Sequence, residues 1–226
     1  DGSLLSKYTC KYDTKGNKTE AALYNSDGSL RSKSIYKYDT QGNKTEEERY
    51  TYTSDGSLQE KRIYKYDTKG NMTEEAMYAS DGSLSIKCIY KYDTNGNKTE
   101  YAYYTSDGLF SKEIYKYDTK GNKTEEAEYN SDGSLDNKWI YKYDTNGNKI
   151  EEAHYASDGS LSSKEIYKYD TQGNKTEYAM YESDGSLWYK YIYKYDSIGN
   201  ITEITEYEGE LQIPQSQTVY TIIYRK

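Results

Sequence analysis

The stretch Ile35-Tyr36-Lys37-Tyr38-Asp39-Thr40-Gln41-Gly42-Asn43-Lys44-Thr45-Glu46 decides the fold of this chain. A frayed copy begins at Thr9, a looser copy begins at Ile192, and close copies begin at Ile63, Ile89, Ile114, Ile140 and Ile166. The glycines of successive copies are 25 to 28 residues apart, most often 26. A period of this length is typical of repeat arrays, in which each unit contacts mainly its neighbours.

The overall composition, taken alone, indicates a disordered chain. Leu, Ile, Val and Phe together make up 28 of the 226 residues, and 30% of the residues are charged. However, the 32 tyrosines recur at fixed positions and bring large amphipathic surfaces, so we expect a folded chain without a thick core. The net charge of −8 argues against a nucleic-acid partner, and no apolar run is long enough to insert into a membrane.

Each repeat carries two turn signals of the same form. Asp39 to Gly42 and Asn25 to Gly28 both begin with an Asx residue and have glycine in the fourth place, which is typical of a type I turn followed by a left-handed residue. The segments between the turns are rich in Tyr, Thr and Ile, and we read them as strands. This hairpin type places Asp39 opposite Asn43 and Asn25 opposite Ser29.

Counting from both turns assigns each residue to one of two faces, provided that the strands alternate regularly. One face is predicted to carry Leu30, Tyr36, Tyr38, Glu46 and Tyr50, together with the alanines Ala76, Ala102 and Ala127. The opposite face is predicted to carry Lys33, Ile35, Lys37, Thr45 and Glu47. In this register Lys87 pairs with Glu75, Lys138 with Glu126 and Lys164 with Glu152.

We therefore predict an all-β repeat protein: a long antiparallel meander of about 17 strands, twisted and largely single-layered, with a rolled shell as the alternative. Residues 1–226 form a single array of about eight hairpin repeats, and residues 200–226 form an atypical C-terminal cap. In that cap, a loop from Gly209 to Gln217 is expected to cover a last strand, Thr218 to Tyr224. The chain opens within a repeat and shows no signal peptide, which indicates a trimmed or processed fragment.

The sequence Tyr64-Lys65-Tyr66-Asp67-Thr68-Lys69-Gly70-Asn71-Met72-Thr73, followed by an Asp-Gly pair, resembles the YD repeats of RHS-type bacterial surface and secreted toxin proteins and of the animal teneurins. MORN repeats and the cell-wall-binding repeats are more distantly similar. The resemblance implies a β-hairpin array, a location outside the cell or on its surface, and no catalysis by the repeats themselves.

Little in the sequence points to chemistry. His154 has no second histidine or cysteine near it, so we expect a structural or solvent-facing role and no metal or catalytic site. The loop from Asp93 to Asn97 has its glycine in the fourth place, as a turn requires, rather than in the sixth place of a calcium loop. Cys10 and Cys88 lie several strands apart and are not expected to form a disulfide. We predict no cofactor and no enzymatic activity.

The tyrosines of the Tyr-Lys-Tyr motifs are the one constellation that suggests binding. Their first reading is structural, because cross-strand aromatic pairs stabilise a sheet. A binding face for a protein, for a second copy of the chain or for a polysaccharide is the sharper reading. Its candidate residues are Tyr36, Tyr38, Tyr64, Tyr66, Tyr90, Tyr92, Tyr115, Tyr117, Tyr141, Tyr143, Tyr167 and Tyr169. We thus expect a non-catalytic extracellular scaffold, with a carbohydrate-binding module as the alternative.

Overall fold

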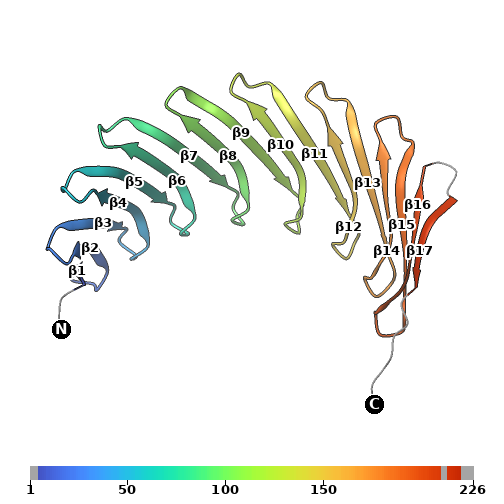
Figure 1. The fold of residues 1–226 in the computed structure, drawn as a ribbon, viewed down its shortest axis with the longest axis horizontal. Helices are drawn as coiled ribbons and strands as arrows, with labels where there is room; N and C mark the ends of the chain where they lie inside the picture. Colours follow the sequence, from blue (N-terminus) through green and yellow to red (C-terminus); the bar gives the residue numbers. More distant parts are fainter. Residues whose placement is uncertain (1–4, 210–212, 220–226) are drawn as a thin grey trace, which may run out of the picture. The chain divides into compact units, whose positions relative to one another are not determined.

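The computed structural model describes residues 5–209 and 213–219. Their regular structure consists of 17 β-strands, which belong to one antiparallel sheet (Figure 1). In this described part of the chain no helix has the length and hydropathy needed to span a membrane. The predicted all-β class and the number of strands are confirmed.

The chain divides into two compact units, residues 1–113 and 114–226. The first unit contains β1 (Ser6–Tyr12), β2 (Lys18–Asn25), β3 (Leu30–Tyr38), β4 (Lys44–Tyr52), β5 (Leu58–Tyr66), β6 (Met72–Ala79), β7 (Leu84–Tyr92) and β8 (Lys98–Thr105). Strand β9 (Gly108–Tyr117) contains the boundary. The second unit contains β10 (Lys123–Asn130), β11 (Leu135–Tyr143), β12 (Lys149–Tyr155), β13 (Leu161–Tyr169), β14 (Lys175–Glu182), β15 (Leu187–Tyr195), β16 (Ile201–Glu208) and β17 (Ile213–Val219).

Within each unit the strands follow one another as a meander. Consecutive strands pair antiparallel, so each strand except the first and the last described one has two partners. No described strand contacts any strand of its unit other than these chain neighbours. The sheet is therefore open and one layer thick in each unit, as the sequence predicts.

The turns have the predicted hairpin form. In the turn after β11, the backbone N–H of Asp144 donates to the carbonyl of Asn148 at 2.9 Å, and Gly147 closes the turn by donating to the carbonyl of Asp144 at 3.1 Å. The Asp144 carboxylate accepts the backbone N–H groups of Asn146 and Asn148 and the side-chain amide of Asn148, all at 2.8–2.9 Å. These hydrogen bonds hold the pKa of Asp144 below its ordinary value, and the bond from the Asn148 side chain has the largest effect.

Six hairpins with a Tyr-Lys-Tyr-Asp turn, from β3–β4 to β7–β8 and from β11–β12 to β15–β16, contain a β-bulge that was not expected from the sequence pattern. In the β3–β4 pair, Tyr38 lies opposite Lys44, but Lys37 lies opposite Glu46, so Thr45 is an extra residue without a partner. A second kind of bulge follows the Asp-Gly turns, where Arg31 is the extra residue between Leu30 and Ser32. A bulge shifts the register by one residue and exchanges the faces of the residues beyond it.

The predicted composition of the two faces is therefore wrong in part. Tyr36 and Tyr38 do share a face, which we call the tyrosine face, but Glu47 lies opposite Tyr36 and belongs to it as well. The other face, which we call the isoleucine face, carries Ile35, Lys33 and Lys37, as predicted. It also carries six residues that had been predicted to lie on the same face as Tyr36 and Tyr38, namely Leu30, Glu46, Tyr50, Ala76, Ala102 and Ala127.

The predicted lysine–glutamate pairs are wrong by one residue for the same reason. Lys87 pairs with Glu74 rather than Glu75, at 3.1 Å, and Lys138 pairs with Glu125 rather than Glu126, at 3.5 Å. Lys164 lies opposite Ala153, and Glu152 lies on the other face. A glutamate of the isoleucine face typically lies between two lysines, one on each neighbouring strand. Each ion pair of this kind near the surface contributes about 0–1 kcal/mol to stability.

No conventional core forms, because a single layer has no interior. The buried apolar residues are mostly alanines, such as Ala76 and Ala179, each 0% exposed. In the described residues no larger side chain is fully buried. Ala76 lies between Ile63 on β5 and Lys87 on β7, whose longer side chains cover it. Cross-strand neighbours, not a second layer, remove these groups from water.

The C-terminal region departs from the prediction. Residues 213–217, expected in a covering loop, are part of β17, which pairs with β16. Most of the predicted last strand, Thr218 to Tyr224, lies outside the described residues. The fourth repeat is one residue shorter, at Asp107 to Leu109, and there β8 and β9 are joined by a two-residue turn, Ser106 and Asp107. Cys10 and Cys88 are free thiols.

The turn glycines yield a direct test of the backbone account. Gly70 has a φ of +86°, and a Cβ built on it would meet nothing within 4 Å. We expect Gly70→Ala to lower the free energy of unfolding by about 1–2 kcal/mol, because alanine avoids the left-handed conformation. Gly70→Asn should lower it by less, because asparagine tolerates that conformation. Urea unfolding measures both, and equal stability of the alanine variant and the parent would contradict the account.

Candidate binding surface

The twelve predicted tyrosines all lie on the tyrosine face, and none of them is fully exposed. Eleven are half-buried, and Tyr115 is buried. They are the first and second tyrosines of successive Tyr-Lys-Tyr motifs, on the odd-numbered strands β3 to β13. The sequence therefore predicted their common face correctly. Whether they bind anything depends on what their rings and hydroxyls already contact.

In five of the motifs the hydroxyl of the second tyrosine ties neighbouring repeats together. The hydroxyl of Tyr143 donates to the backbone carbonyl of Lys123, which lies one repeat earlier, at 2.8 Å. The same bond recurs at 2.7–3.0 Å in other repeats, from Tyr38 to Lys18, Tyr92 to Met72, Tyr169 to Lys149 and Tyr195 to Lys175. These hydroxyls satisfy carbonyls near the bulges, so they are engaged within the sheet.

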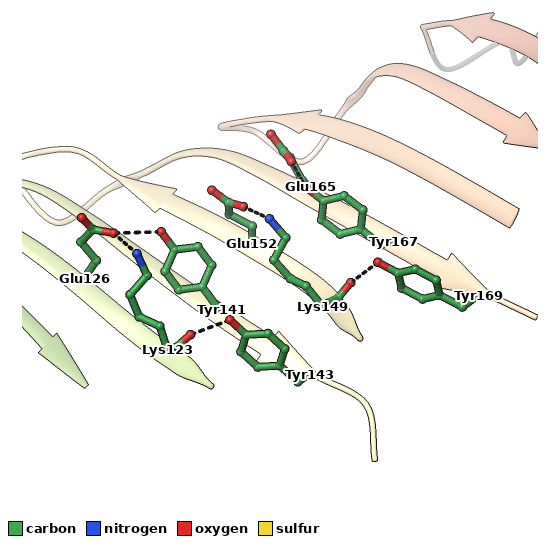
Figure 2. Close-up of polar contacts among 9 residues, drawn as sticks. All are labelled: Lys123, Glu126, Tyr141, Tyr143, Lys149, Glu152, Glu165, Tyr167 and Tyr169. Carbon is green, nitrogen blue, oxygen red and sulfur yellow. Dashed lines mark hydrogen bonds and ion pairs between the residues drawn. The ribbon is translucent and has the colours of Figure 1, made fainter. Parts of the chain in front are cut away.

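In most motifs the first tyrosine contacts a lysine that was not among the residues predicted for this face. The ammonium of Lys149 lies 4.8 Å from the ring centre of Tyr167 and 5.9 Å from that of Tyr141 (Figure 2). Its Nζ also lies 2.5 Å from the Glu152 carboxylate. Lys123 repeats the arrangement with Tyr115, Tyr141 and Glu126. Lys149 and Lys123 thus each combine a cation–π contact with an ion pair.

Hydroxyl and carboxylate groups on this face also bond directly. Tyr141 donates to Glu126 at 3.3 Å, and Tyr167 donates to Glu165 (Figure 2). Burial raises the pKa of the Tyr141 hydroxyl above its ordinary value, and the negative charges of Glu126 and Glu152 raise it further. Burial also raises the pKa of Tyr143. The face is thus an interlocked network of rings, ammonium groups and carboxylates.

In two hairpins a tyrosine replaces the glutamate of this network. Tyr101 and Tyr178 stand where other repeats have Glu126 or Glu152. Tyr101 packs against Tyr90, and Tyr178 packs against Tyr167, each with ring centres 5.3 Å apart. Around Tyr178 the rings of Tyr189, Tyr191 and Trp188 extend the contact. In the sequence this cluster is visible as the aromatic run of residues 187–195, a departure from the repeat that was not predicted as a site.

Each unit has a recess between two successive Asp-Asn turns. One, of about 670 Å³, is lined by Asp144, Asn146, Ile150, Tyr169 and Asp170 among others. Another, of about 400 Å³, is lined by residues at matching places in the first unit, including Asp13, Tyr38 and Asp39. Both are open to solvent, and both combine polar turn groups with a tyrosine.

No further chemistry gathers at His154. Its ring stacks on Trp139 at 4.9 Å, and its Nε2 lies 3.1 Å from the side-chain oxygen of Asn137. Within residues 5–209 and 213–219, no group of three or more His, Cys, Asp or Glu side chains could hold a metal ion. The Cys88 thiol lies 3.4 Å from the hydroxyl of Tyr101.

Comparison with known proteins gives limited similarities. Residues 52–103 match the family model described as a protein of unknown function, DUF2963. No curated protein sequence matches the chain. Among solved structures, a porin-like protein from Bacteroides uniformis ATCC 8492 is 10% identical, with 96% of this chain and 97% of that chain covered and a TM-score of 0.38.

Two toxin assemblies are also similar. A chain of the TcdB2-TccC3-Cdc42 structure is 12% identical, with 93% of this chain and 16% of that chain covered and a TM-score of 0.26. A chain of the Photorhabdus luminescens Tc holotoxin pore is 12% identical, with 94% and 16% covered and a TM-score of 0.26. This chain thus spans 16% of the length of either toxin chain, and similarities of this size carry no argument about function.

The hydrogen bond from the tyrosine hydroxyl to the backbone carbonyl can be tested by removing the hydroxyl oxygen. We expect Tyr143→Phe to lower the free energy of unfolding by about 0.5–1.5 kcal/mol, because it removes the bond to the Lys123 carbonyl. Tyr12 occupies the same place in the first repeat but is 62% exposed, so Tyr12→Phe should change the stability by less than about 0.5 kcal/mol. Chemical denaturation of both variants gives the comparison. Equal losses would contradict a special role for the bond.

Proposed function

We propose that this chain is a non-catalytic repeat scaffold of the YD-repeat type, located outside the cell or on its surface. The Tyr-x-Tyr-Asp-x-x-Gly-Asn-x-Thr motif supports the relationship to YD repeats, and it occupies the same hairpin turn in each repeat. The acidic net charge favours solubility of a sheet whose two faces both meet water.

One observation carries the proposal: the repeated side chains contact one another. Tyr141 and Tyr143 contact Lys123 and Glu126 of the repeat before them. The tyrosines that suggested a ligand platform are therefore explained by cohesion between repeats. A surface built in this way suits a spacer, a shell or an adhesive protein-interaction surface.

The absence of catalysis is part of the proposal. An active site needs a nucleophile, a base and a charge-stabilising group that are set apart from their surroundings. Ser and Asp residues occupy turns in every repeat, where hydrogen bonds such as Ser160 to Asp158 explain them. His154 is stacked and hydrogen-bonded, away from any such pair.

Carbohydrate binding is the second candidate, and the recurring recesses favour it. Polar turn groups beside a tyrosine ring suit the hydroxyls and the apolar face of a sugar. Weak sites at a fixed spacing gain avidity toward a polymer. In this candidate the ligand would bind along the turns rather than on the centre of the tyrosine face.

Two measurements test the proposal. Antibody labelling of intact and permeabilised producing cells should give equal signals if the chain is outside or on the surface, and labelling that needs permeabilisation would contradict that location. A broad glycan panel should give no saturable binding for a scaffold. Binding that Tyr169→Ala weakens about tenfold or more, with folding retained, would replace the scaffold by the carbohydrate-binding function.

A further inference from the structure

One part of the tyrosine face in the second unit breaks the repeat. Strand β15 reads Leu187-Trp188-Tyr189-Lys190-Tyr191, where β5 reads Leu58-Gln59-Glu60-Lys61-Arg62 at the same distance from its Tyr-Lys-Tyr motif. We define the Trp188 patch as Tyr178, Trp188, Tyr189, Tyr191, Glu206 and Glu208.

The rings of this patch are in mutual contact. Trp188 is the extra residue of a bulge, which places its ring against Tyr189, with ring centres 5.1 Å apart and planes at 67°. Tyr189 meets Tyr191 at 5.7 Å and 72°, and Tyr191 stacks on Tyr178 at 6.4 Å and 13°. Trp188 is 48% exposed. The cluster is therefore open to solvent at Trp188, while Tyr178, Tyr189 and Tyr191 are half-buried.

Two carboxylates border the rings. The register places Glu206 opposite Tyr191 and Glu208 opposite Tyr189 on the neighbouring strand. Glu206 accepts hydrogen bonds from the hydroxyls of Tyr191 at 2.8 Å and Ser216 at 2.9 Å, which orient it. Glu208 is exposed, and its carboxylate makes no hydrogen bond or ion pair with the described part of the chain.

Elsewhere on the tyrosine face, a ring and a neighbouring carboxylate are in contact with a cation. In the first unit the guanidinium of Arg49 lies 5.0 Å from the ring centre of Tyr64, and its Nε lies 2.5 Å from the Glu47 carboxylate. In the second unit Lys149 combines Tyr167 with Glu152 in the same way. An aromatic ring, a carboxylate and a cation thus recur together as one three-part arrangement.

Around Trp188, Tyr189 and Tyr191, the patch holds the rings and carboxylates of that arrangement without a cation over them. Lys175 lies over Tyr178 and Tyr193, at the end of the cluster away from Glu208. Among the described residues, no lysine or arginine lies over Trp188, Tyr189 or Tyr191. The patch also carries two formal negative charges, in a chain of net charge −8.

We propose that the Trp188 patch binds a guanidinium or ammonium side chain presented by a basic segment of a partner protein. The cation would lie against the exposed Trp188 ring and the half-buried Tyr189 ring and would pair with Glu208, with Glu206 beside it. Aromatic faces and carboxylates attract such groups together, and a planar guanidinium can stack and donate at the same time. The inference rests on this patch alone, so it can fail while the scaffold proposal stands.

The test uses Trp188 as its own reporter. Trp139→Phe leaves Trp188 as the one tryptophan and keeps an aromatic ring against His154. Titration with an Arg-Gly-Arg-Gly amide should change its fluorescence saturably, and added salt should weaken the binding. The matched probe Cit-Gly-Cit-Gly amide, in which neutral citrulline replaces arginine, should bind about three- to tenfold more weakly.

Variants of the same background locate the site. Glu208→Gln should weaken the arginine peptide about three- to tenfold, and Trp188→Ala, followed by calorimetry, should abolish measurable binding. Asp136→Asn removes one charge at the equivalent bulge of β11 and should leave the affinity unchanged. Circular dichroism checks that each variant is folded. No saturable signal, equal binding of the citrulline peptide, or equal effects of Glu208→Gln and Asp136→Asn would overturn the proposal.

Discussion

A sheet one layer thick leaves both of its faces in water, and this constraint governs the rest of the structure. No second layer can bury an apolar surface, so each strand must be held by the strands beside it. The side chains respond with cross-strand contacts on both faces. On the isoleucine face Lys65 and Lys87 flank Glu74, and on the tyrosine face Lys149 joins Glu152 to two rings. Each contact is worth little, but contacts of this kind recur along the array.

The same constraint explains why the tyrosines are so numerous. A tyrosine ring covers a large area and still carries a hydroxyl that can reach a carbonyl one repeat away, as Tyr143 reaches Lys123. Leucine or isoleucine would cover a similar area but could not satisfy that carbonyl. Tyrosine thus serves a face that is half-buried by its neighbours and half-wet.

Much of this fold could be predicted from the sequence, because short-range chemistry determines it. Asp144 and Gly147 define a hairpin by their own conformational preferences and hydrogen bonds, so the turns, the strands and their number can be deduced directly. The bulges could not be predicted in the same way. Thr45 fits a regular strand as well as a bulge, and the choice depends on whether Lys37 meets Thr45 or Glu46 across the hairpin. That balance involves both neighbouring strands at once.

The candidate surface likewise has residues that the sequence predicted and residues that it did not. The twelve tyrosines were found because they repeat, and their common face results from alternation alone. The lysines and glutamates that engage them were missed, since a one-residue shift moves Glu126 and Glu152 from one face to the other. The Trp188 patch was missed for a different reason: it departs from the repeat, whereas the predicted sites were the features that the repeats share.

Within each unit, the described strands contact only the strands that precede and follow them in the chain, so neighbouring repeats hold one another. The most direct test deletes one complete unit, Ile140 to Glu165, which joins Trp139 to Ile166 and preserves the strand direction. The account predicts a folded, cooperative protein with the same circular dichroism per residue and a lower free energy of unfolding. Deletion of a single strand with its turn, Ile140 to Glu152, reverses the direction of every later strand and should prevent native pairing. Global unfolding after the complete-unit deletion would contradict the account.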